Sequence, residues 1–320
     1  MVASKVVIGI DFGTTYSGVS WALNEGQRSI RLITDWPDPS ATNPNTEKVP
    51  TVISYKNGQV KNWGYEVGLK EEAFRWFKIL LEPDYLKGIR KTTEEVSHSR
   101  ELLDRMKKSA EDVIADFLEQ LWKYTQEDIR KRVEGLEDDD WESSMDVDVI
   151  LTVPAMWSHA ARAKTLRAAI AAGLPKDLQL VTEPEAAALA TLRDKSDEDS
   201  LQDGDVFLVC DAGGGTVDLI SYKVNSMNPL RVEECAVGKG DLCGSVFLDS
   251  GFEKYIMTLV GEAQYKGLRE VDRKKMLKTF EYGVKRSFST QSSKDYSVDL
   301  RGVKDNEEYG IVEETISLDQ

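Results

Sequence analysis

Cysteine and histidine are scarce in this sequence, and their scarcity argues against two kinds of site. The 320 residues include three cysteines, Cys210, Cys235 and Cys243, and two histidines, His98 and His159. An odd cysteine count without a short spacing argues against a disulfide scaffold and against a CxxC metal site. Two histidines cannot build a multi-histidine metal centre. We therefore expect a cytoplasmic protein with reduced thiols, and Cys210, which ends an apolar run, is expected to be buried.

Long apolar runs are also absent, and acidic residues outnumber basic ones by 56 to 41. No run of 18 or more apolar residues occurs, so no membrane-spanning helix is expected. Residues 1–5 lack the order of a signal peptide. The formal net charge of −15 disfavours binding to nucleic acid and to anionic membranes. A nucleotide could bind only where backbone N–H groups, a lysine and a metal ion cancel this charge locally.

The order of apolar segments indicates an α/β protein that is long enough for two lobes. Strand patterns occur at 6–10, 17–23, 51–55, 59–63, 147–153, 178–181, 206–210 and 217–224, and helix patterns at 103–121, at 160–172 and from Pro184 onward. The pair Asn57-Gly58 suits a tight hairpin turn in which both residues need positive φ. The polar stretch 194–202 is interpreted as a hinge between lobes.

Two similar units lie about 200 residues apart, each a strand, an acidic Gly-Thr turn and a second strand. The first turn, residues 11–15, reads Asp-Phe-Gly-Thr-Thr, and the second, residues 211–216, reads Asp-Ala-Gly-Gly-Gly-Thr. A glycine-containing turn between strands points successive N–H groups into one concavity, which binds anionic oxygens. The repetition therefore suggests two lobes of one plan that close on a shared ligand.

An aspartate beside a phosphate is explained if Mg²⁺ lies between them, often with water in between. Asp11 and Asp211 would then hold the metal from two sides. The alternative is that each turn is only a hairpin corner, but two such turns flanked by apolar strands favour the phosphate site. No GxxxxGK[ST] loop occurs, and the glycines of residues 238–244 do not have the GxGxxG spacing.

Four segments resemble the ATPase domain of the heat-shock-70 family of chaperones, in the right order and at roughly the right distances. They are Ile8–Ser17 and Asp211–Asp218, which resemble the two phosphate loops, Leu151–Ala155, which resembles the TVPA segment, and Val181–Ala188, which resembles the NEPTAAA segment. The resemblance is weak between these motifs. The chain is therefore identified as a divergent member of the family.

The resemblance implies the actin-like ATPase fold, which is ribonuclease H-like, with ATP at the base of a cleft between two lobes. The first lobe would span 1–200, with a smaller subdomain at about 47–144, and the second lobe would span 201–320. This second lobe would be incomplete, because the family's last adenosine loop and its peptide-binding domain have no counterpart in the sequence.

The resemblance also implies roles for residues at matched positions. Asp11 and Asp211 would orient Mg²⁺ through water. The phosphates of ATP or ADP would lie against Gly13, Thr14, Thr15, Tyr16, Gly213, Gly214 and Gly215. The catalytic set would be Lys78 and Thr216 near the γ-phosphate, with Glu183 and Asp218 orienting waters. The adenosine would contact Lys285, Arg286 and Ser289.

Some of these matches leave alternatives open. Lys78 could instead be an ordinary residue of an amphipathic helix. Pro154 and Arg162 keep the spacing of the pair that relays nucleotide state to the partner domain in the family. Ser245 stands where a second glycine is expected, and Tyr282 stands where the family has a glutamate.

Three functions follow from these observations. The first is a Mg-ATP-binding chaperone switch, which is an ATPase producing ADP and phosphate if it is active. The second is a relative that binds nucleotide without turnover or is inert. The third, a small-molecule kinase of the same fold, fits the motifs less well. Co-chaperones and client proteins are the partners that the first function implies besides the nucleotide, and neither nucleic acid nor membrane is expected to bind.

Overall fold

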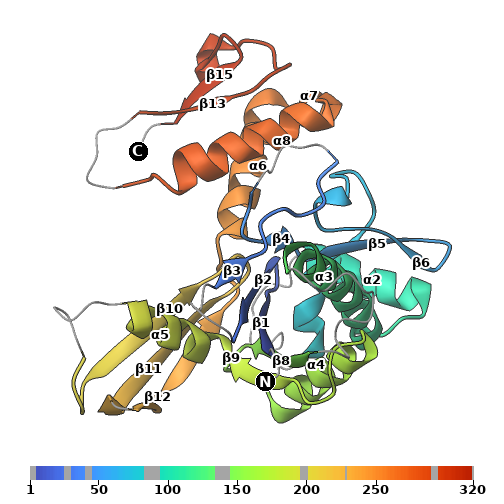
Figure 1. The fold of residues 1–320 in the computed structure, drawn as a ribbon. Coiled ribbons are helices and arrows are strands. Elements are labelled where there is room, and N and C mark those ends of the chain that lie inside the picture. Colours follow the sequence, from blue (N-terminus) through green and yellow to red (C-terminus); the bar gives the residue numbers. More distant parts are fainter. Residues whose placement is uncertain are drawn as a thin grey trace. The chain divides into compact units, whose positions relative to one another are not determined.

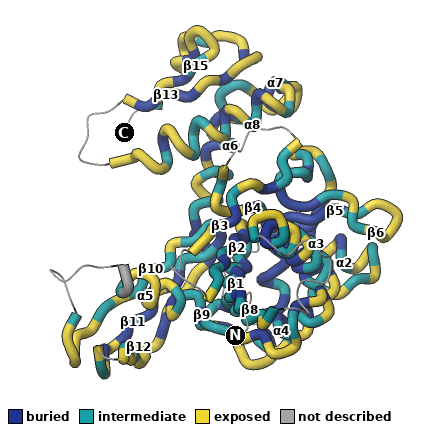
Figure 2. Tube along the Cα trace, viewed as in Figure 1, coloured by how far each residue is buried: buried dark blue, intermediate teal, exposed yellow. Residues whose placement is uncertain are grey.

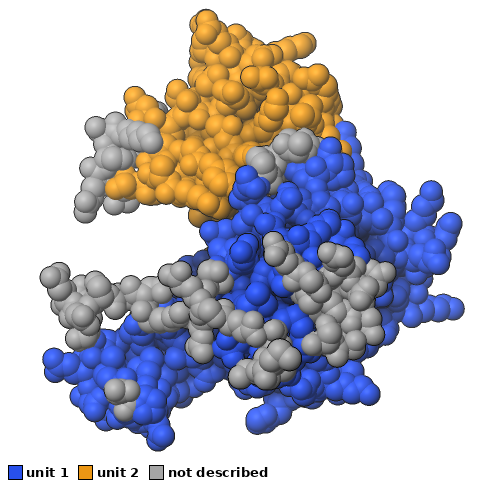
Figure 3. Space-filling model, in the orientation of Figure 1, with its two compact units in different colours: residues 1–242 blue, residues 243–320 orange. Residues whose placement is uncertain are grey.

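The computed structural model divides the chain into two compact units, Met1–Leu242 and Cys243–Gln320 (Figure 3). It describes residues 5–24, 30–39, 45–82, 94–133, 145–194, 201–227, 229–289 and 295–318. Most of the expected hinge, 194–202, lies outside these residues. The expected division into lobes at residue 200 stays a prediction.

The larger unit is built on a mixed sheet with the strand order β3-β2-β1-β8-β9 (Figure 1). Its strands are β1 (Lys5–Phe12), β2 (Tyr16–Leu23), β3 (Arg31–Leu32), β8 (Asp146–Val153) and β9 (Gln179–Thr182), and β4 (Val49–Pro50) pairs with β2. β1 runs antiparallel to β2 and parallel to β8, and β8 runs parallel to β9. The structure confirms the α/β class.

β1 lies between β2 and β8 in this sheet, and every second side chain of β1 is buried. Val6, Ile8, Ile10 and Phe12 are all buried, and they join the main core together with residues of helix α3 (Ala110–Arg132). The burial view shows β1 and the strands beside it as the most buried part of the unit (Figure 2). Helix α4 (His159–Ala171) buries Ala161, Ala168 and Ala169, whose small side chains let it pack closely.

The prediction of a single long helix over 103–121 is wrong. The chain forms α2 (Glu94–Met106) and then α3, and Lys107 between them has a φ of 54°. Ser109 is the N-cap of α3, and Ser109 and Asp112 form a reciprocal capping box. Such a cap satisfies the first N–H groups of α3, so a new helix can begin there. The apolar stripe therefore continues across the junction between two helices.

The expected hairpin and helix ends are confirmed. Strands β5 (Val52–Lys56) and β6 (Gln59–Trp63) flank Asn57 and Gly58, whose φ values are 54° and 79°. β7 (Phe74–Arg75) completes this small sheet, and the 3-10 helices η1 (Gly64–Glu66) and η2 (Phe77–Leu81) follow β6 and β7. Gly173, just beyond α4, has the positive φ that a C′ glycine supplies.

A second sheet in the same unit carries the second glycine-rich turn. It consists of β10 (Val206–Ala212), β11 (Val217–Met227) and β12 (Leu230–Asp241), all antiparallel. The sequence patterns did not predict β12. Helix α5 (Glu183–Asp194) contacts both β9 of the first sheet and β10 of the second.

The expectation that Cys210 is buried is wrong, because its side chain is exposed. In β10 alternate residues are exposed, and Val206 and Leu208 on the same face as Cys210 are 62% and 59% exposed. The opposite face of the sheet buries Ile220 and Val224 of β11. An apolar run therefore identified the strand but not which of its faces is covered.

The smaller unit has its own core. Its helices are α6 (Val246–Val260), α7 (Glu262–Gly267), α8 (Glu270–Thr279), the π-helix η5 (Phe280–Lys285) and the 3-10 helix η6 (Glu307–Tyr309), and its strands are β13 (Tyr296–Asp299), β14 (Ile311–Val312) and β15 (Thr315–Leu318). Phe252 and Phe280 stack with their ring centroids 4.1 Å apart. Within the described part of the chain, no helix combines the length and the apolar character needed to cross a bilayer.

The exposure of Cys210 predicts a reactive thiol in the native protein. In a variant with Cys235→Ser and Cys243→Ser, a thiol-reactive disulfide reagent should modify Cys210 at a rate close to that in denaturant, because access controls the reaction. The release of the coloured thiolate measures this rate. A native rate far below the denatured rate would show that Cys210 is covered.

Candidate functional site

The two glycine-rich turns are corners of hairpins with the same loop length. The first loop, residues 13–16, follows the pair Phe12–Ser17 of β1 and β2, and the second, residues 213–216, follows the pair Ala212–Val217 of β10 and β11. Asp11 and Asp211 each lie one residue before the last pair. Across the ladder, Asp11 faces Gly18, whereas Asp211 faces Asp218.

The two turns are in contact, although their sequences lie about 200 residues apart. A Cβ added to Gly214 would lie 1.9 Å from the Oγ1 atom of Thr15, and one added to Gly215 would lie 3.1 Å from the Cγ2 atom of Thr14. A Cβ on Gly13 would lie 2.0 Å from the backbone oxygen of Tyr16. Glycine is thus required at residues 13 and 214 by close approach.

Carboxylates gather where the turns meet, and burial works against their charge. Burial, followed by repulsion from Asp11, raises the pKa of Asp211. Burial also raises the pKa of Glu183, although the ammonium group of Lys78 opposes this rise. Negative charge that is poorly solvated in this way favours a bound cation.

Asp218 has the same electrostatic environment and an unused oxygen. Burial raises its pKa, while a hydrogen bond from the hydroxyl of Thr216 acts in the opposite direction. Its Oδ1 atom is buried and has no hydrogen-bond partner. Since buried carboxylate oxygens are normally paired, this atom points to a ligand or a water in the functional state.

Lys78 lies at the bottom of the site with its side chain only 1% exposed. Its Nζ donates to the Oε1 atom of Glu183 at 2.6 Å and to the backbone oxygen of Phe12. The rings of Phe12 and Trp157 lie 5.3 and 5.4 Å from the same nitrogen. The structure therefore places Lys78 beside Glu183 rather than on the solvent face of a helix.

The sequence reasoning missed Lys48. Its Nζ donates to the Oδ2 atom of Asp11 at 2.7 Å. Burial alone would lower the pKa of Lys48, but the carboxylates of Asp11, Asp211 and Glu183 raise it above its ordinary value. The available signal was weak, because Lys48 lies outside every motif and 37 residues from Asp11.

The segment that follows Lys48 is attached to the first turn by several hydrogen bonds. The backbone N–H of Thr51 donates to the oxygen of Thr15 at 2.8 Å, and its hydroxyl donates to the oxygen of Gly13 at 2.9 Å. The hydroxyls of Thr51 and Ser17 are 2.8 Å apart. Tyr16, at the start of β2, pairs with Pro50.

The TVPA-like turn is also fixed by its arginine. Arg162 donates to the backbone oxygens of Ala155 and Trp157 at 2.9 and 3.3 Å. The spacing of Pro154 and Arg162 therefore returns the guanidinium group to this turn. The relay that the resemblance implies stays a prediction.

The three residues expected at the adenosine belong to the smaller unit. Lys285 pairs with Asp249 at 2.8 Å and also with Glu281. Arg286 pairs with Glu281 at 3.1 Å and lies 4.4 Å from the ring centroid of Tyr282. Ser289 is exposed. Their contact with adenosine stays a prediction.

Nucleotide and Mg²⁺ fit the groups in the larger unit. Gly213, Gly214 and Gly215 carry no side chain that would cover the N–H groups of the second turn, and Asp218 carries a buried oxygen without a hydrogen-bond partner. Among the residues that the structure describes, no three Cys, His, Asp or Glu side chains form a metal-binding cluster. Mg²⁺ typically uses one or two carboxylates together with waters and phosphate oxygens, and Asp11 and Asp211 could supply the two carboxylates.

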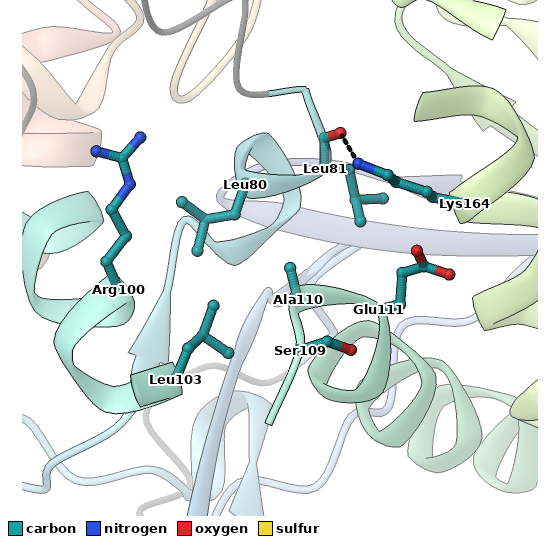
Figure 4. Close-up of a pocket in the computed structure, with 8 residues that line it drawn as sticks. All are labelled: Leu80, Leu81, Arg100, Leu103, Ser109, Ala110, Glu111 and Lys164. Atoms are coloured by element: carbon teal, nitrogen blue, oxygen red, sulfur yellow. Dashed lines mark hydrogen bonds between the residues drawn. The ribbon is translucent and has the colours of Figure 1, made fainter. Parts of the chain in front are cut away.

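A pocket away from the turns contains none of the predicted site residues (Figure 4). Its volume is about 310 Å³ and its lining consists of Leu80, Leu81, Arg100, Leu103, Ser109, Ala110, Glu111 and Lys164. Lys164 already donates to the backbone oxygen of Leu81 at 3.2 Å, and Glu111 pairs with Arg167 at 2.9 Å. These charges stabilise the packing of the unit and do not indicate a ligand.

Comparison with known proteins gives consistent matches. A family model described as Hsp70 protein matches residues 7–317. Heat shock 70 kDa protein 12A of Mus musculus is 26% identical over 80% of this chain and 46% of its own length. The chaperone protein DnaK of Mycoplasmopsis agalactiae is 32% identical over 68% of this chain and 30% of its own length. The chain thus spans less than half of these relatives.

The close approach at Gly13 predicts a large effect of a single methyl group. Gly13→Ala should lower the free energy of unfolding by about 2–3 kcal/mol, because the backbone oxygen of Tyr16 would have to move. Urea denaturation followed by circular dichroism measures this change. The matched control is Gly251→Ala in α6, where the added methyl group meets no atom within 4 Å. Equal stability of the two variants would contradict the prediction.

The raised pKa of Asp218 predicts a stability that depends on pH. A carboxyl whose pKa is higher in the folded than in the unfolded chain favours folding at low pH, and this contribution is lost as the pH rises through the folded pKa. Asp218→Asn should therefore raise the melting temperature of the ligand-free protein at pH 7. The gain should vanish below about pH 4, where both states are protonated.

Scanning calorimetry from pH 3 to pH 8 measures this gain. Asp177→Asn, at an exposed residue, is the control and should show no comparable dependence on pH. A constant difference between Asp218→Asn and the wild type at all pH values would show that the carboxylate charge is not the cause.

Proposed function

This chain belongs to the Hsp70 family and has that family's actin-like ATPase fold, and from this premise we propose that it binds ATP and ADP with Mg²⁺ between its two glycine-rich turns. The observation that carries the proposal is the contact of Gly214 and Gly215 with Thr15 and Thr14. This contact brings the N–H groups of two turns to one place, as binding of a chain of phosphates requires.

The proposed roles of the site residues follow from their charge. The glycines of both turns and the hydroxyls of Thr14, Thr15 and Thr216 would face phosphate oxygens. Asp11 and Asp211 would hold Mg²⁺ through water, and the ion would supply the positive charge that phosphoryl transfer needs. Tyr16, which follows Thr15, would also contact the nucleotide.

We further propose that the site can hydrolyse ATP slowly. The unpaired Oδ1 atom of Asp218 and the carboxylate of Glu183 are acceptors for the protons of a water, and the raised pKa of each favours such a role. Lys78, held by Glu183, would direct its charge toward the terminal phosphate. Lys285, Arg286 and Ser289 of the smaller unit would contact the adenosine.

For the longer relatives, the printed names describe heat shock and chaperone proteins. We propose by extension that this chain is the nucleotide-binding part of a cytoplasmic chaperone, with co-chaperones or clients as partners. The family membership and the matching turns support this extension.

Thermal unfolding with and without ligand tests the proposal. Mg-ATP and Mg-ADP at about 100 times the dissociation constant should stabilise the chain by about 2.7 kcal/mol, because only the folded form binds. Asp211→Asn should lose the dependence of this shift on Mg²⁺. Asp177→Asn should retain it, since its carboxylate is exposed and lies in no motif.

A cooperative melt without any shift by ligand would contradict nucleotide binding. A shift without release of phosphate over hours would support binding alone and contradict the hydrolysis. Transfer of phosphate to sugars or carboxylates would instead favour a kinase of the same fold.

A further inference from the structure

Lys48 reaches the candidate site from a segment that the motifs do not include. It directly precedes β4, and β4 pairs with β2 immediately beyond the first turn. Tyr65 donates to the backbone oxygen of Lys48 at 3.0 Å, and Thr51, three residues later, is bonded to Gly13 and Thr15. The backbone of Lys48 is thus fixed with respect to the first turn.

The stem of Lys48 lies against Gly18. The Cγ atom of Lys48 would lie 3.4 Å from a Cβ at residue 18, which is an ordinary contact distance. Gly18 is also the residue that faces Asp11 across the ladder. The side chain of Lys48 therefore passes over the hairpin and places its ammonium group on the Oδ2 atom of Asp11.

The two lysines of the site differ in how far they can move. Lys78 is 1% exposed and is held by Glu183 and by the backbone oxygen of Phe12. The side chain of Lys48 is 54% exposed, and its ammonium group pairs with Asp11, whose side chain is 40% exposed. A solvated pair of this kind contributes little to stability and can exchange partners.

The charges near the turns favour a change of partner by Lys48. Asp11, Asp211, Glu183 and Asp218 supply four carboxylates near the turns, and Lys48 and Lys78 supply two ammonium groups. Phosphate oxygens add more negative charge to this set. Because the pair with Asp11 is solvated, phosphate oxygens beside the first turn can compete with Asp11 for the ammonium group of Lys48, whether or not Mg²⁺ is present.

We propose that Lys48 is a phosphate-binding residue of the nucleotide site, which holds Asp11 in the ligand-free chain and turns to the phosphates when nucleotide binds. This inference rests on the proposed nucleotide binding. Lys48 then supplies part of the positive charge that Mg²⁺ otherwise provides. Removal of divalent metal therefore weakens nucleotide binding less in the wild type than in a variant that lacks Lys48.

The test compares nucleotide affinity with and without Mg²⁺. Binding of a fluorescent ATP analogue to the full 320-residue chain is titrated in excess Mg²⁺ and again in EDTA. The measured quantity is the ratio of the dissociation constant in EDTA to the dissociation constant in Mg²⁺. Lys48→Met should increase this ratio by about tenfold, which corresponds to one charge-assisted hydrogen bond. Lys48→Arg should keep the ratio near that of the wild type, because it keeps the charge.

Lys123→Met is the matched control. Lys123 also forms an exposed lysine–carboxylate pair, with Glu119 at 2.6 Å on α3, so its loss should leave the ratio unchanged. The melting temperature of each ligand-free variant shows whether it is folded, and Lys48→Gln, which also removes the charge, takes the place of Lys48→Met if that variant does not fold.

Three results would overturn the inference. They are an unchanged ratio in Lys48→Met, tighter binding of Mg-nucleotide by that variant, and a wild type that binds nucleotide in Mg²⁺ but not at all in EDTA. A folded wild type that binds no nucleotide even in Mg²⁺ would instead overturn the proposed function, and the inference with it.

Discussion

The contact between two glycine-rich turns is the constraint on which the candidate site depends. A side chain at residue 214 would collide with Thr15, and one at residue 13 would collide with the carbonyl group of the same turn. Because the turns meet, the carboxylates that precede them also meet, and their burial raises the pKa of Asp211. The cost of gathering these charges is the physical reason why two lysines, and in our proposal a divalent cation, belong to the site.

Much of the fold was predictable because its signals are local. Apolar segments of strand length identified β1, β2, β8, β10 and β11, and Asn57-Gly58 identified a hairpin by its backbone requirement. The errors arose where the answer depended on distant residues or on one capping bond. The apolar stripe of 103–121 continues through the cap at Ser109, and the apolar run that ends at Cys210 says nothing about what covers each face of β10. β12 was missed because charged residues interrupt its pattern.

The candidate site was predictable to the extent that it lies in motifs. The carboxylates and glycines of the turns were identified from spacing, and the larger unit brings them together. Lys48 was not identifiable in this way, since a two-residue strand and a set of hydroxyl bonds carry it to Asp11. The residues expected at the adenosine could be matched by position, but their neighbours Asp249 and Glu281 depend on the packing of helices in the smaller unit.

The hydrogen bonds of Thr51 have a mechanical consequence. Thr51 is bonded to Gly13 and Thr15 of the first turn, and the next residue, Val52, begins the small sheet of β5, β6 and β7. Since Thr51 is bonded to the turn and is followed directly by the first strand of this sheet, a displacement of the turn would also displace the start of that strand. The positions of the first turn and of the β5–β6 hairpin are thus coupled through Thr51.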